Sequence, residues 1–446
     1  VESVYNDEIS QKVVSETSES IAENVQPIPD SKPDNNNYSS NNYLCRNSEN
    51  YNAKIKKKKI FSEILSSPGI SRIKLARKCS YSKTTVSILV DELIKEGYVE
   101  DGGTAINSGH TQGRKPTSLF PNTSKYTVLI VNLDKKCAQI AMADLTTQIS
   151  RVREVSITQP DNPQAELFHN LEQYIHRECE KFYILAVCWI LPAMIDREND
   201  QLISAVLEER MTDHFFEQAE YRFPQIRHFY FNDTACLAYA EKVHGRFPSA
   251  EDFVYINMND GIGAAFVLKG NLLGGPVGLT TQFGSFSLTR EGTDKKKSCL
   301  ENEIGEKGIR ERFLKIMQEH GDEKEELPEN FCYKDIQKLA GEGNISAENL
   351  LKEISRDISY ALGNLITILH VKRIMIGGSG RELGSYFLDC IRCDIQNIGF
   401  RQFVENTEIV YSELDHYAVL DGAVHYFLDQ CFEFVNSCME EQKEIG

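Results

Sequence analysis

Residues 71–100 read SRIKLARKCSYSKTTVSILVDELIKEGYVE, and this stretch decides the fold of the N-terminal part of the chain. Ser71 can accept a hydrogen bond from a backbone N–H in the first turn of a helix, so it is a good N-cap, and the next helical pattern starts at Ser82. Gly97 follows the second helical pattern and marks its C-terminal end. The stretch therefore predicts two short helices joined by a turn, which is a helix-turn-helix arrangement.

Apolar residues in these two predicted helices recur at helical spacing. The first helix has three candidates for the inward face, Ile73, Leu75 and Ala76. The second helix has five, Val86, Leu89, Val90, Leu93 and Ile94. The polar residues near the start of the second helix are then left for an external partner, and they are Ser82, Lys83, Thr84, Thr85 and Ser87. A recognition helix directs this end toward base edges in the major groove of DNA, so we predict that these residues bind DNA.

Charge is distributed very unevenly along the chain. The protein has 446 residues and a formal net charge of -17, which would argue against nucleic-acid binding if it were spread evenly. Residues 1–50 contain 9 acidic and 3 basic residues, whereas residues 51–120 contain 6 acidic and 13 basic ones. A single basic segment in an acidic protein is expected if only that segment meets phosphate groups.

Two further basic groups lie close to the predicted helix pair. The run Lys56–Lys59 can neutralise DNA phosphates, although a run of charge also fits an ordinary solvated helix face. Residues 98–120 are predicted to form a β-hairpin wing with a glycine-rich tip that carries Arg114 and Lys115. An extended basic tip fits the minor groove, so we expect these two side chains to bind DNA as well.

Composition divides the chain into three predicted parts. Residues 1–51 are rich in Asn, Ser and acidic residues and are predicted to be a disordered tail. Residues 52–121 form the predicted winged helix-turn-helix domain. In residues 122–446, strand-like runs such as YTVLIVNL and FYILAVCWIL alternate with amphipathic helices, which is typical of an α/β fold.

Composition also limits the environment of the protein. No apolar run reaches the roughly 20 residues that a bilayer span requires, and the N-terminal residues do not resemble a secretory signal. Twelve irregularly spaced cysteines suit reduced thiols rather than a disulfide framework, and Cys390 and Cys393 are interpreted as two core cysteines on one helix. We therefore expect a cytoplasmic protein that makes no contact with a membrane.

The helix-turn-helix stretch, followed by GRKPTSLF at residues 113–120, closely resembles regulators of the ROK family (repressor, open reading frame, kinase), and the xylose repressors are the nearest type. The resemblance covers nearly everything after about residue 52. It implies an α/β protein in which an N-terminal winged helix-turn-helix precedes a two-lobed, actin-like or ribonuclease-H-like sugar kinase fold.

The two phosphate-binding motifs of the family's kinases are altered here. The first is a glycine-rich D-x-G-G-T turn, and this chain has no glycine at the corresponding residues 132–137. A side chain there obstructs the approach of backbone amides to a phosphate. The second motif, G-T-G-I-G, corresponds to residues 259–263, where Asp260 would repel a phosphate. We expect Gly261 and Gly263 to serve in a hairpin turn.

The sugar-binding segments are partly retained. Asn232 and Asp233 match the family's E-N-D-A-N segment, whose Asp is the catalytic base in the kinases. A purely structural interpretation of Asp233 is the N-cap of the following helix, which is compatible with sugar contact. In the family's A-G-E-x-G-H segment, Gln282 replaces the Glu and Ser285 replaces the His. The resemblance thus implies a ligand site that includes Asn232, Asp233 and Gln282.

The family's structural zinc site is reduced to a single residue. That site uses the His replaced by Ser285 and three cysteines, of which only Cys299 is present. We therefore predict no bound metal and no cofactor, and we expect the loop before Cys299 to be held by other contacts or to be mobile.

The resemblance implies a transcriptional regulator, a repressor of carbohydrate-related genes, that has no enzymatic activity. Its expected partners are a palindromic double-stranded DNA operator, a sugar or sugar phosphate effector, and further copies of the chain in a homodimer or tetramer. One alternative is a regulator whose ROK domain serves only as a dimerisation scaffold. Another is an ATP-dependent sugar kinase, which Asp233 favours and Asp260 opposes.

Overall fold

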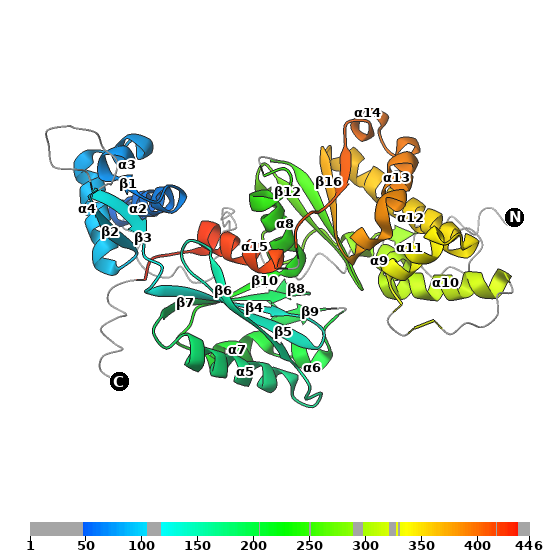
Figure 1. Ribbon diagram of the computed structural model, residues 1–446, viewed down its shortest axis with the longest axis horizontal. Coiled ribbons are helices and arrows are strands. Elements are labelled where there is room, and N and C mark those ends of the chain that lie inside the picture. The colour runs from blue at the N-terminus through cyan, green and yellow to red at the C-terminus, as the bar shows by residue number, and fades with distance from the viewer. Residues whose placement is uncertain are drawn as a thin grey trace, which may run out of the picture. The chain divides into compact units, whose positions relative to one another are not determined.

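The computed structural model describes residues 48–104, 117–204, 206–248, 251–288, 298–320, 327–328, 331–415 and 417–435 (Figure 1). The chain divides into two units, Val1–Ala53 and Lys54–Gly446. The contacts discussed below lie within the second unit. The predicted tail, residues 1–51, lies outside the described residues except where the first helix begins, at Ser48.

The N-terminal head is built from three helices and a small antiparallel sheet. The helices are α2 (Ser48–Ser66), α3 (Arg72–Cys79) and α4 (Lys83–Glu96). The strands are β1 (Ile70–Ser71), β2 (Val99–Thr104) and β3 (Thr117–Pro121), in the order β1-β3-β2. The pairing of β2 with β3 provides the two strands of the predicted wing. The head therefore has the elements of a winged helix-turn-helix.

The helix boundaries in the head follow the residues that the sequence singles out. The Ser71 side chain accepts a hydrogen bond from the Lys74 N–H, and Ser82 accepts one from the Thr85 N–H. Gly97 ends α4 with a left-handed φ of 84°, a conformation that glycine adopts at low cost.

The buried faces of α3 and α4 differ from the prediction at one position. Val86, Leu89, Val90 and Leu93 are buried in α4, and Leu75 and Ala76 are buried in α3. The prediction that Ile73 faces inward is wrong, because its side chain is 47% exposed. Leu75, Ala76 and Cys79 share one face of α3, and at about 100° per residue Ile73 points away from that face.

The first lobe that follows contains a five-stranded sheet in the order β10-β7-β4-β5-β6. Its strands are β4 (Tyr126–Leu133), β5 (Cys137–Ala143), β6 (Ile149–Ser156), β7 (Tyr183–Leu191) and β10 (His228–Asn232). Helices α5 (Pro163–Glu178), α6 (Glu209–Thr212) and α7 (Phe215–Arg222) and the hairpin β8 (Met194–Asp196) to β9 (Gln201–Ile203) complete it. Strands β4 and β7 are buried along most of their length because helices cover both faces of this sheet.

The second lobe contains a sheet in the order β13-β12-β11-β16-β17. Its strands are β11 (Phe253–Met258), β12 (Ile262–Leu268), β13 (Asn271–Leu272), β16 (Arg373–Gly378) and β17 (Glu408–Tyr411). In both lobes the first strand pairs antiparallel with the second and parallel with the fourth, so the two sheets have the same topology. This duplication is the arrangement of an actin-like fold.

Helices cover one face of the second sheet. They are α9 (Leu300–Ile304), α10 (Glu306–His320), α11 (Tyr333–Gly341), α12 (Ile345–Leu369), α13 (Gly384–Asp394) and α14 (Arg401–Val404). A short pair, β14 (Ser287–Leu288) and β15 (Ser298–Cys299), and the 3-10 turns η1 (Phe283–Ser285), η2 (Ser379–Leu383) and η3 (Ile395–Asn397) connect these elements. Cys390 and Cys393 lie on α13 as predicted, but Cys393 is exposed rather than part of the core.

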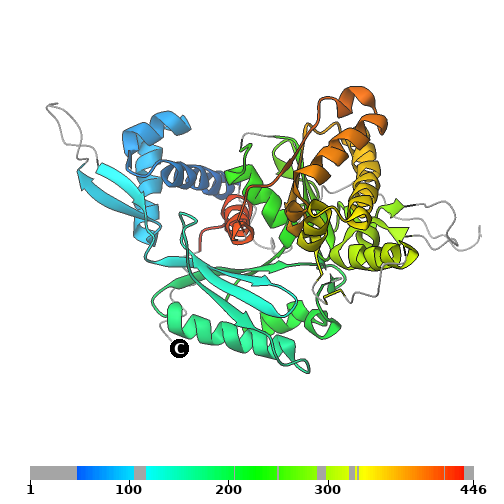
Figure 2. The ribbon, with the colours of Figure 1, turned by 45° about the vertical axis from the view of Figure 1, so that its right-hand side comes forward.

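Two helices pack together between the two sheets. Helix α8 (Asp233–His244) lies against β11 and β12, and α15 (Ala418–Tyr426) lies against β4 and β7. Figure 2 shows α15, in red, on the face of the first sheet opposite α5. Gly422 allows the close approach of the two helices, since a Cβ there would lie 1.9 Å from the carbonyl oxygen of Cys236. The segment around Gly422 therefore packs α15 closely against α8.

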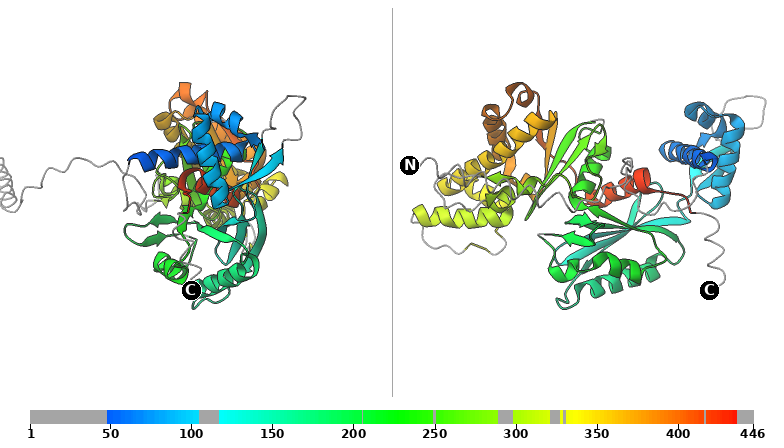
Figure 3. Two further views of the ribbon diagram at one scale, coloured as in Figure 1. Left: turned by 90° about the vertical axis from the view of Figure 1, so that its left-hand side faces the viewer. Right: turned by 180° about the vertical axis from the view of Figure 1, so that it is seen from behind.

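A short segment after α15 returns to the head. Residues 427–431 form a π-helical turn, η4 (Phe427–Cys431), and residues 432–435 continue to the N-terminal domain (Figure 3, right). Among the described helices, none is both long enough and apolar enough to cross a bilayer.

Candidate nucleic-acid interface and effector site

The N-terminal end of α4 presents the predicted DNA-reading residues. Ser82 and Thr85 bind each other, with 2.8 Å between their hydroxyl oxygens, in addition to the cap made by Ser82. Lys83 and Thr84, which lie between them, are both exposed. The structure therefore leaves Lys83 and Thr84 available at the surface and fixes the first turn of the helix around them.

Ser87 lies one turn further along α4 and is bound within the head. The Arg72 guanidinium donates hydrogen bonds to the Ser87 side chain at 3.1 Å and to its backbone carbonyl at 3.3 Å. The same guanidinium forms an ion pair with Asp91 at 2.7 Å. Arg72 thus fastens α3 to α4 and fixes the angle at which α4 is presented.

The four lysines of the run Lys56–Lys59 have different environments. Lys57 is buried and forms an ion pair with Glu96 at 2.6 Å, so it supports the head internally. Burial lowers the pKa of Lys58. Lys56 and Lys59 are exposed and lie over the ring of Tyr81, at 6.0 Å and 5.5 Å from its centroid. Only the last two have the exposure that phosphate contact requires.

The tip of the wing, with Arg114 and Lys115, lies outside the described residues. Its strands are described, and Val99 pairs with Pro121 while Thr104 pairs with Thr117. The interpretation of Arg114 and Lys115 as DNA ligands stays a prediction.

An aromatic joint connects the head to the first lobe. The Tyr98 ring stacks on Tyr126 with 4.4 Å between centroids and an interplanar angle of 14°. The Tyr98 hydroxyl accepts a hydrogen bond from the Val435 N–H at 2.8 Å, and Phe432 and Phe434 pack edge-on against the Tyr98 ring. Sequence reasoning missed this joint, because nothing in the local pattern around Val435 identifies a partner so far away in the chain.

In the predicted effector site, Asn232 caps helix α8. Its side-chain oxygen accepts the Ala235 N–H at 3.1 Å, and its amide nitrogen donates to the Ala193 carbonyl at 3.0 Å. The structural interpretation of Asp233 as the N-cap is therefore wrong, because the chain enters the helix one residue earlier and Asp233 is its first residue. Both ends of the Asn232 amide are already hydrogen bonded.

Asp233 is held at the start of α8 by two neighbours. Its carboxylate accepts the Thr234 N–H at 2.7 Å and an Asn257 amide hydrogen at 3.4 Å. Burial raises the pKa of Asp233 to about 6, the hydrogen bonds from Thr234 oppose the shift, and the charge of Asp134 adds to it. A carboxyl group in such surroundings can accept or donate a hydrogen bond near neutral pH.

Gln282 reaches the same region through a glycine-rich loop. Its amide nitrogen donates to the Gly278 carbonyl at 2.7 Å. Gly278 has a left-handed φ of 69°, and a Cβ there would lie 3.0 Å from the Asn232 side chain. The structure therefore brings the Gln282 loop against Asn232, next to Asp233 at the end of β10, as the resemblance implies.

The two altered phosphate motifs also face each other. Lys135, in the turn between β4 and β5, forms an ion pair with Asp260 at 3.7 Å. Residues 259–261 form the turn of the hairpin β11–β12, which confirms the turn role expected of Gly261. The turn role expected of Gly263 is wrong, because Gly263 lies within β12 and pairs with Asn257, and a Cβ there would lie 2.4 Å from the Thr234 hydroxyl oxygen. This ion pair connects the two segments that correspond to the phosphate-binding motifs of the family's kinases.

Asn259 holds the segment that follows the C-terminal end of β16. Its side-chain oxygen accepts hydrogen bonds from the Ser379 N–H at 2.8 Å and hydroxyl at 3.1 Å. Gly378 has a left-handed φ of 71°, and a Cβ there would lie within 2.7 Å of Met258, Asn259 and Asn257 oxygens. Glycine is therefore required at this strand-to-helix turn.

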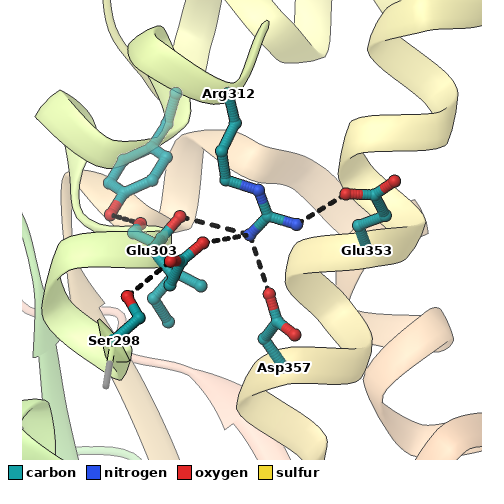
Figure 4. A network of polar contacts seen from close by, with 7 residues as sticks. Ser298, Glu303, Arg312, Glu353 and Asp357 are labelled. Atoms are coloured by element: carbon teal, nitrogen blue, oxygen red, sulfur yellow. Dashed lines mark hydrogen bonds and ion pairs between the residues drawn. The ribbon is translucent and has the colours of Figure 1, made fainter. Parts of the chain in front are cut away.

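A polar network lies next to the segment that corresponds to the family's zinc site (Figure 4). Residues 289–297 lie outside the described residues, but Ser298, next to Cys299, hydrogen bonds to Glu303. Glu303 contacts Arg312, which forms ion pairs with Asp357 and Glu353, both at 2.7 Å. This network fixes Ser298 to α9, α10 and α12, and the absence of a zinc ion from this region stays a prediction.

The fold and site together define a class of protein: a winged helix-turn-helix joined to a two-lobed, sugar-kinase-like domain. A family model described as the ROK family matches residues 131–430, and one described as winged helix-turn-helix DNA-binding matches residues 54–100. The chain belongs to the ROK family. The resemblance inferred from sequence and the predicted fold class are confirmed.

Similar proteins include regulators. The DNA-binding transcriptional dual regulator NagC of Escherichia coli (strain K12) is 24% identical over 356 residues, which cover 78% of this chain and 86% of NagC. The xylose repressor of Bacillus subtilis (strain 168) is 24% identical over 387 residues, which cover 84% of this chain and 96% of that repressor.

Solved structures show the same fold in regulators and kinases. A ROK family transcriptional regulator, described as a homolog of the E. coli MLC protein, has a TM-score of 0.71 at 20% identity and covers 85% of this chain and 96% of its own. The ROK hexokinase from Thermus thermophilus has a TM-score of 0.53 at 17% identity and covers 67% of this chain and 97% of its own.

Proposed function

We propose that the protein is a DNA-binding transcriptional regulator, a repressor of carbohydrate-related genes, with its DNA-binding domain over residues 52–121 and its ROK domain over residues 122–446. The observation that carries the proposal is the exposed pair Lys83 and Thr84 at the start of α4, on a helix whose opposite face is fully packed. The regulators among the similar proteins support it.

The DNA interface combines a rigid reading helix with flanking phosphate contacts. Lys83 and Thr84 read base edges, Ser82, Thr85 and Ser87 hold the first turns of α4 in position, and Lys56 and Lys59 meet phosphates. Arg114 and Lys115 enter the adjacent minor groove from the wing. A homodimer or tetramer pairs two such heads on a palindromic operator.

The ROK domain acts as a sensor without kinase activity. The Lys135–Asp260 pair and the absence of glycine from residues 132–137 both oppose phosphate binding. Asn232, Asp233 and Gln282 meet around one loop and offer hydrogen bonds to a polyhydroxylated ligand, a sugar or sugar phosphate. The ligand changes DNA affinity only if it binds the two lobe arrangements unequally.

A second candidate, a regulator whose ROK domain is only a dimerisation scaffold, is favoured by one observation. Both ends of the Asn232 amide and the amide nitrogen of Gln282 are used in hydrogen bonds within the protein. A sugar must replace those bonds in order to bind there.

DNA binding is tested on the full chain with fragments of its own upstream DNA at two salt concentrations. We expect specific, salt-sensitive binding that Lys83→Ala weakens by about 1 to 3 kcal/mol with relaxed sequence specificity, because Lys83 reads base edges. Lys95→Ala is the matched control, because Lys95 is an exposed lysine at the other end of α4. Equal weakening in both variants would show that Lys83 acts only through its charge, and no specific binding anywhere in the genome would refute the proposal.

The sensor role is tested by calorimetry with a panel of sugars and sugar phosphates. We expect one ligand to bind, to change operator affinity, and to lose binding in Asp233→Asn. Binding with no change in operator affinity, or no binding at all, would support the scaffold. Release of ADP in the presence of ATP and any of these sugars would contradict the absence of kinase activity.

A further inference from the structure

Three metal-ligating side chains meet where α8 and α15 pack together, away from the predicted effector site. His244 is the last residue of α8, and Asp421 and His425 lie four residues apart on α15. Residues at this spacing share one face of a helix, so both α15 side chains point toward the end of α8. Their ligand atoms lie within 4.8 Å of one another.

The distances among the three ligand atoms fit a single cation. His244 Nε2 lies 3.1 Å from an Asp421 oxygen and 3.2 Å from His425 Nε2, and His425 Nε2 lies 3.6 Å from the other Asp421 oxygen. In a tetrahedral zinc site with bonds of about 2.0 to 2.1 Å, neighbouring ligands lie about 3.3 Å apart. The spacings are close to this value, with each histidine nearest to a different Asp421 oxygen, so the three residues can supply three of the four ligands.

The electrostatic surroundings also favour a cation. The C-terminal end of α8 carries a partial negative charge from its unpaired carbonyl groups, and the Asp421 carboxylate adds a full one. Burial lowers the pKa of His425, opposed by Asp421 and Asp429, so its ring nitrogen is available as a neutral ligand. His244 is half exposed, which leaves a route for an ion and a fourth position for water.

We propose that His244, Asp421 and His425 form a binding site for one zinc-class divalent cation, which fastens α8 to α15. Two imidazoles and a carboxylate suit Zn²⁺ and Co²⁺, whereas Mg²⁺ and Ca²⁺ require a shell of oxygen ligands. The site shares no residue with Ser285 and Cys299, the positions that correspond to the family's zinc ligands. It joins α8, which Asn232 caps, to α15, after which the chain continues to the head.

The test uses the full chain, freed of metal with a chelator that is then removed, and titrated with Co²⁺. We expect one Co²⁺ per chain with the intense visible absorption of a tetrahedral site, displaced by Zn²⁺ and unaffected by Mg²⁺. A near-ultraviolet thiolate band would instead assign the metal to cysteines and overturn the proposal. Failure to bind Co²⁺ or Zn²⁺ at millimolar concentration would also overturn it.

Two variants and one control locate the site. His425→Ala and His244→Ala should each weaken Co²⁺ binding by more than about 100-fold. His214→Ala is the matched control, because His214 belongs to the second cluster among the described residues, with Asp200 and Glu217, and all three are exposed. Binding that is lost in His214→Ala and kept in His425→Ala would refute the assignment.

Thermal unfolding separates loss of the ligand from loss of the fold. His244 is half exposed, so His244→Ala without metal should melt within a few degrees of the wild-type protein. Zn²⁺ should then raise the melting temperature of the wild type and of His214→Ala but not of His244→Ala, since a cation stabilises only the state that binds it. An equal rise in all three proteins would contradict the proposal.

Discussion

Among single residues, Asp233 lowers the free energy of unfolding when it is charged, and it is also a predicted ligand-binding residue. Its carboxyl group lies at the start of α8 and has a pKa raised to about 6, mainly by burial. An unfolded aspartate has a pKa near 4, so the unfolded state binds fewer protons than the folded state between these two values. The charged form of Asp233 therefore destabilises the fold above pH 6, and this cost vanishes below about pH 4.

Asp233→Asn removes that cost while keeping an acceptor for the Thr234 N–H. We expect the variant to exceed the wild type in free energy of unfolding by up to about 3 kcal/mol at pH 7, and to match it near pH 4. Urea unfolding at the two pH values measures the difference. A difference that is the same at both values would show that Asp233 ionises as freely in the folded protein as in the unfolded chain.

Several single residues could be placed from the sequence, and the reasons are local. Ser71, Ser82 and Gly97 are helix ends because their own side chains, or the lack of one, satisfy the terminal backbone groups. The burial of Lys57 could not be predicted in this way, because Glu96, its ion-pair partner, comes near only when α2 packs on α4.

At the scale of elements, the end of α4 fixes how the reading helix meets the wing. Gly97 has a φ of 84°, and a Cβ there would also lie 2.6 Å from the Lys125 side chain. Lys125 donates to the Glu96 carbonyl at the same helix end. Gly97 thus allows the chain to turn after α4, and it leaves room for the Lys125 side chain to donate to the last carbonyl of the helix.

Gly97→Ala should lower the free energy of unfolding by about 1 to 2 kcal/mol, because a side chain is disfavoured in the left-handed conformation. Gly341→Ala is the control, since Gly341 ends α11, has no neighbour within 4 Å of a Cβ, and should gain up to about 1 kcal/mol. Chemical denaturation of both variants measures the contrast. A loss of stability in Gly341→Ala as large as in Gly97→Ala would mean that the left-handed conformation is not the cause.

The sequence predicts the elements better than their arrangement. Buried strands such as β4 and β7 stand out as apolar runs, and the α/β class follows from their alternation with helices. The equivalence of the two sheets has no signal in the sequence, because topology depends on pairings between distant strands. The meeting of Gln282 with Asn232 became predictable only through the family resemblance.

In the molecule as a whole, aromatic contacts join the head, the first lobe and the segment after α15. Phe432 is 2% exposed and lies against Phe61 of α2, Tyr98 of the head and Phe427 after α15. The head, the first lobe and the last described segment therefore share one core.

Phe432→Ala should cost about 3 to 5 kcal/mol and loosen the head more than the lobes. Hydrogen exchange followed by mass spectrometry should show faster exchange in α2 and β2, with β11 and β16 unchanged. Phe400→Ala is the control, because Phe400 is 48% exposed. Faster exchange throughout the chain would show that Phe432 supports the whole fold rather than the joint.

The hydrogen bond from Val435 to Tyr98 spans 337 positions of the sequence, and this has a consequence for biosynthesis. A ribosome releases the head first and the segment that completes its core last. During translation the helices of the head can form, but their aromatic joint stays open until residues 432–435 have emerged. A chain interrupted before Phe432 would carry a head without the aromatic joint, so the contacts that support α2 and β2 can form only after this segment has been synthesised.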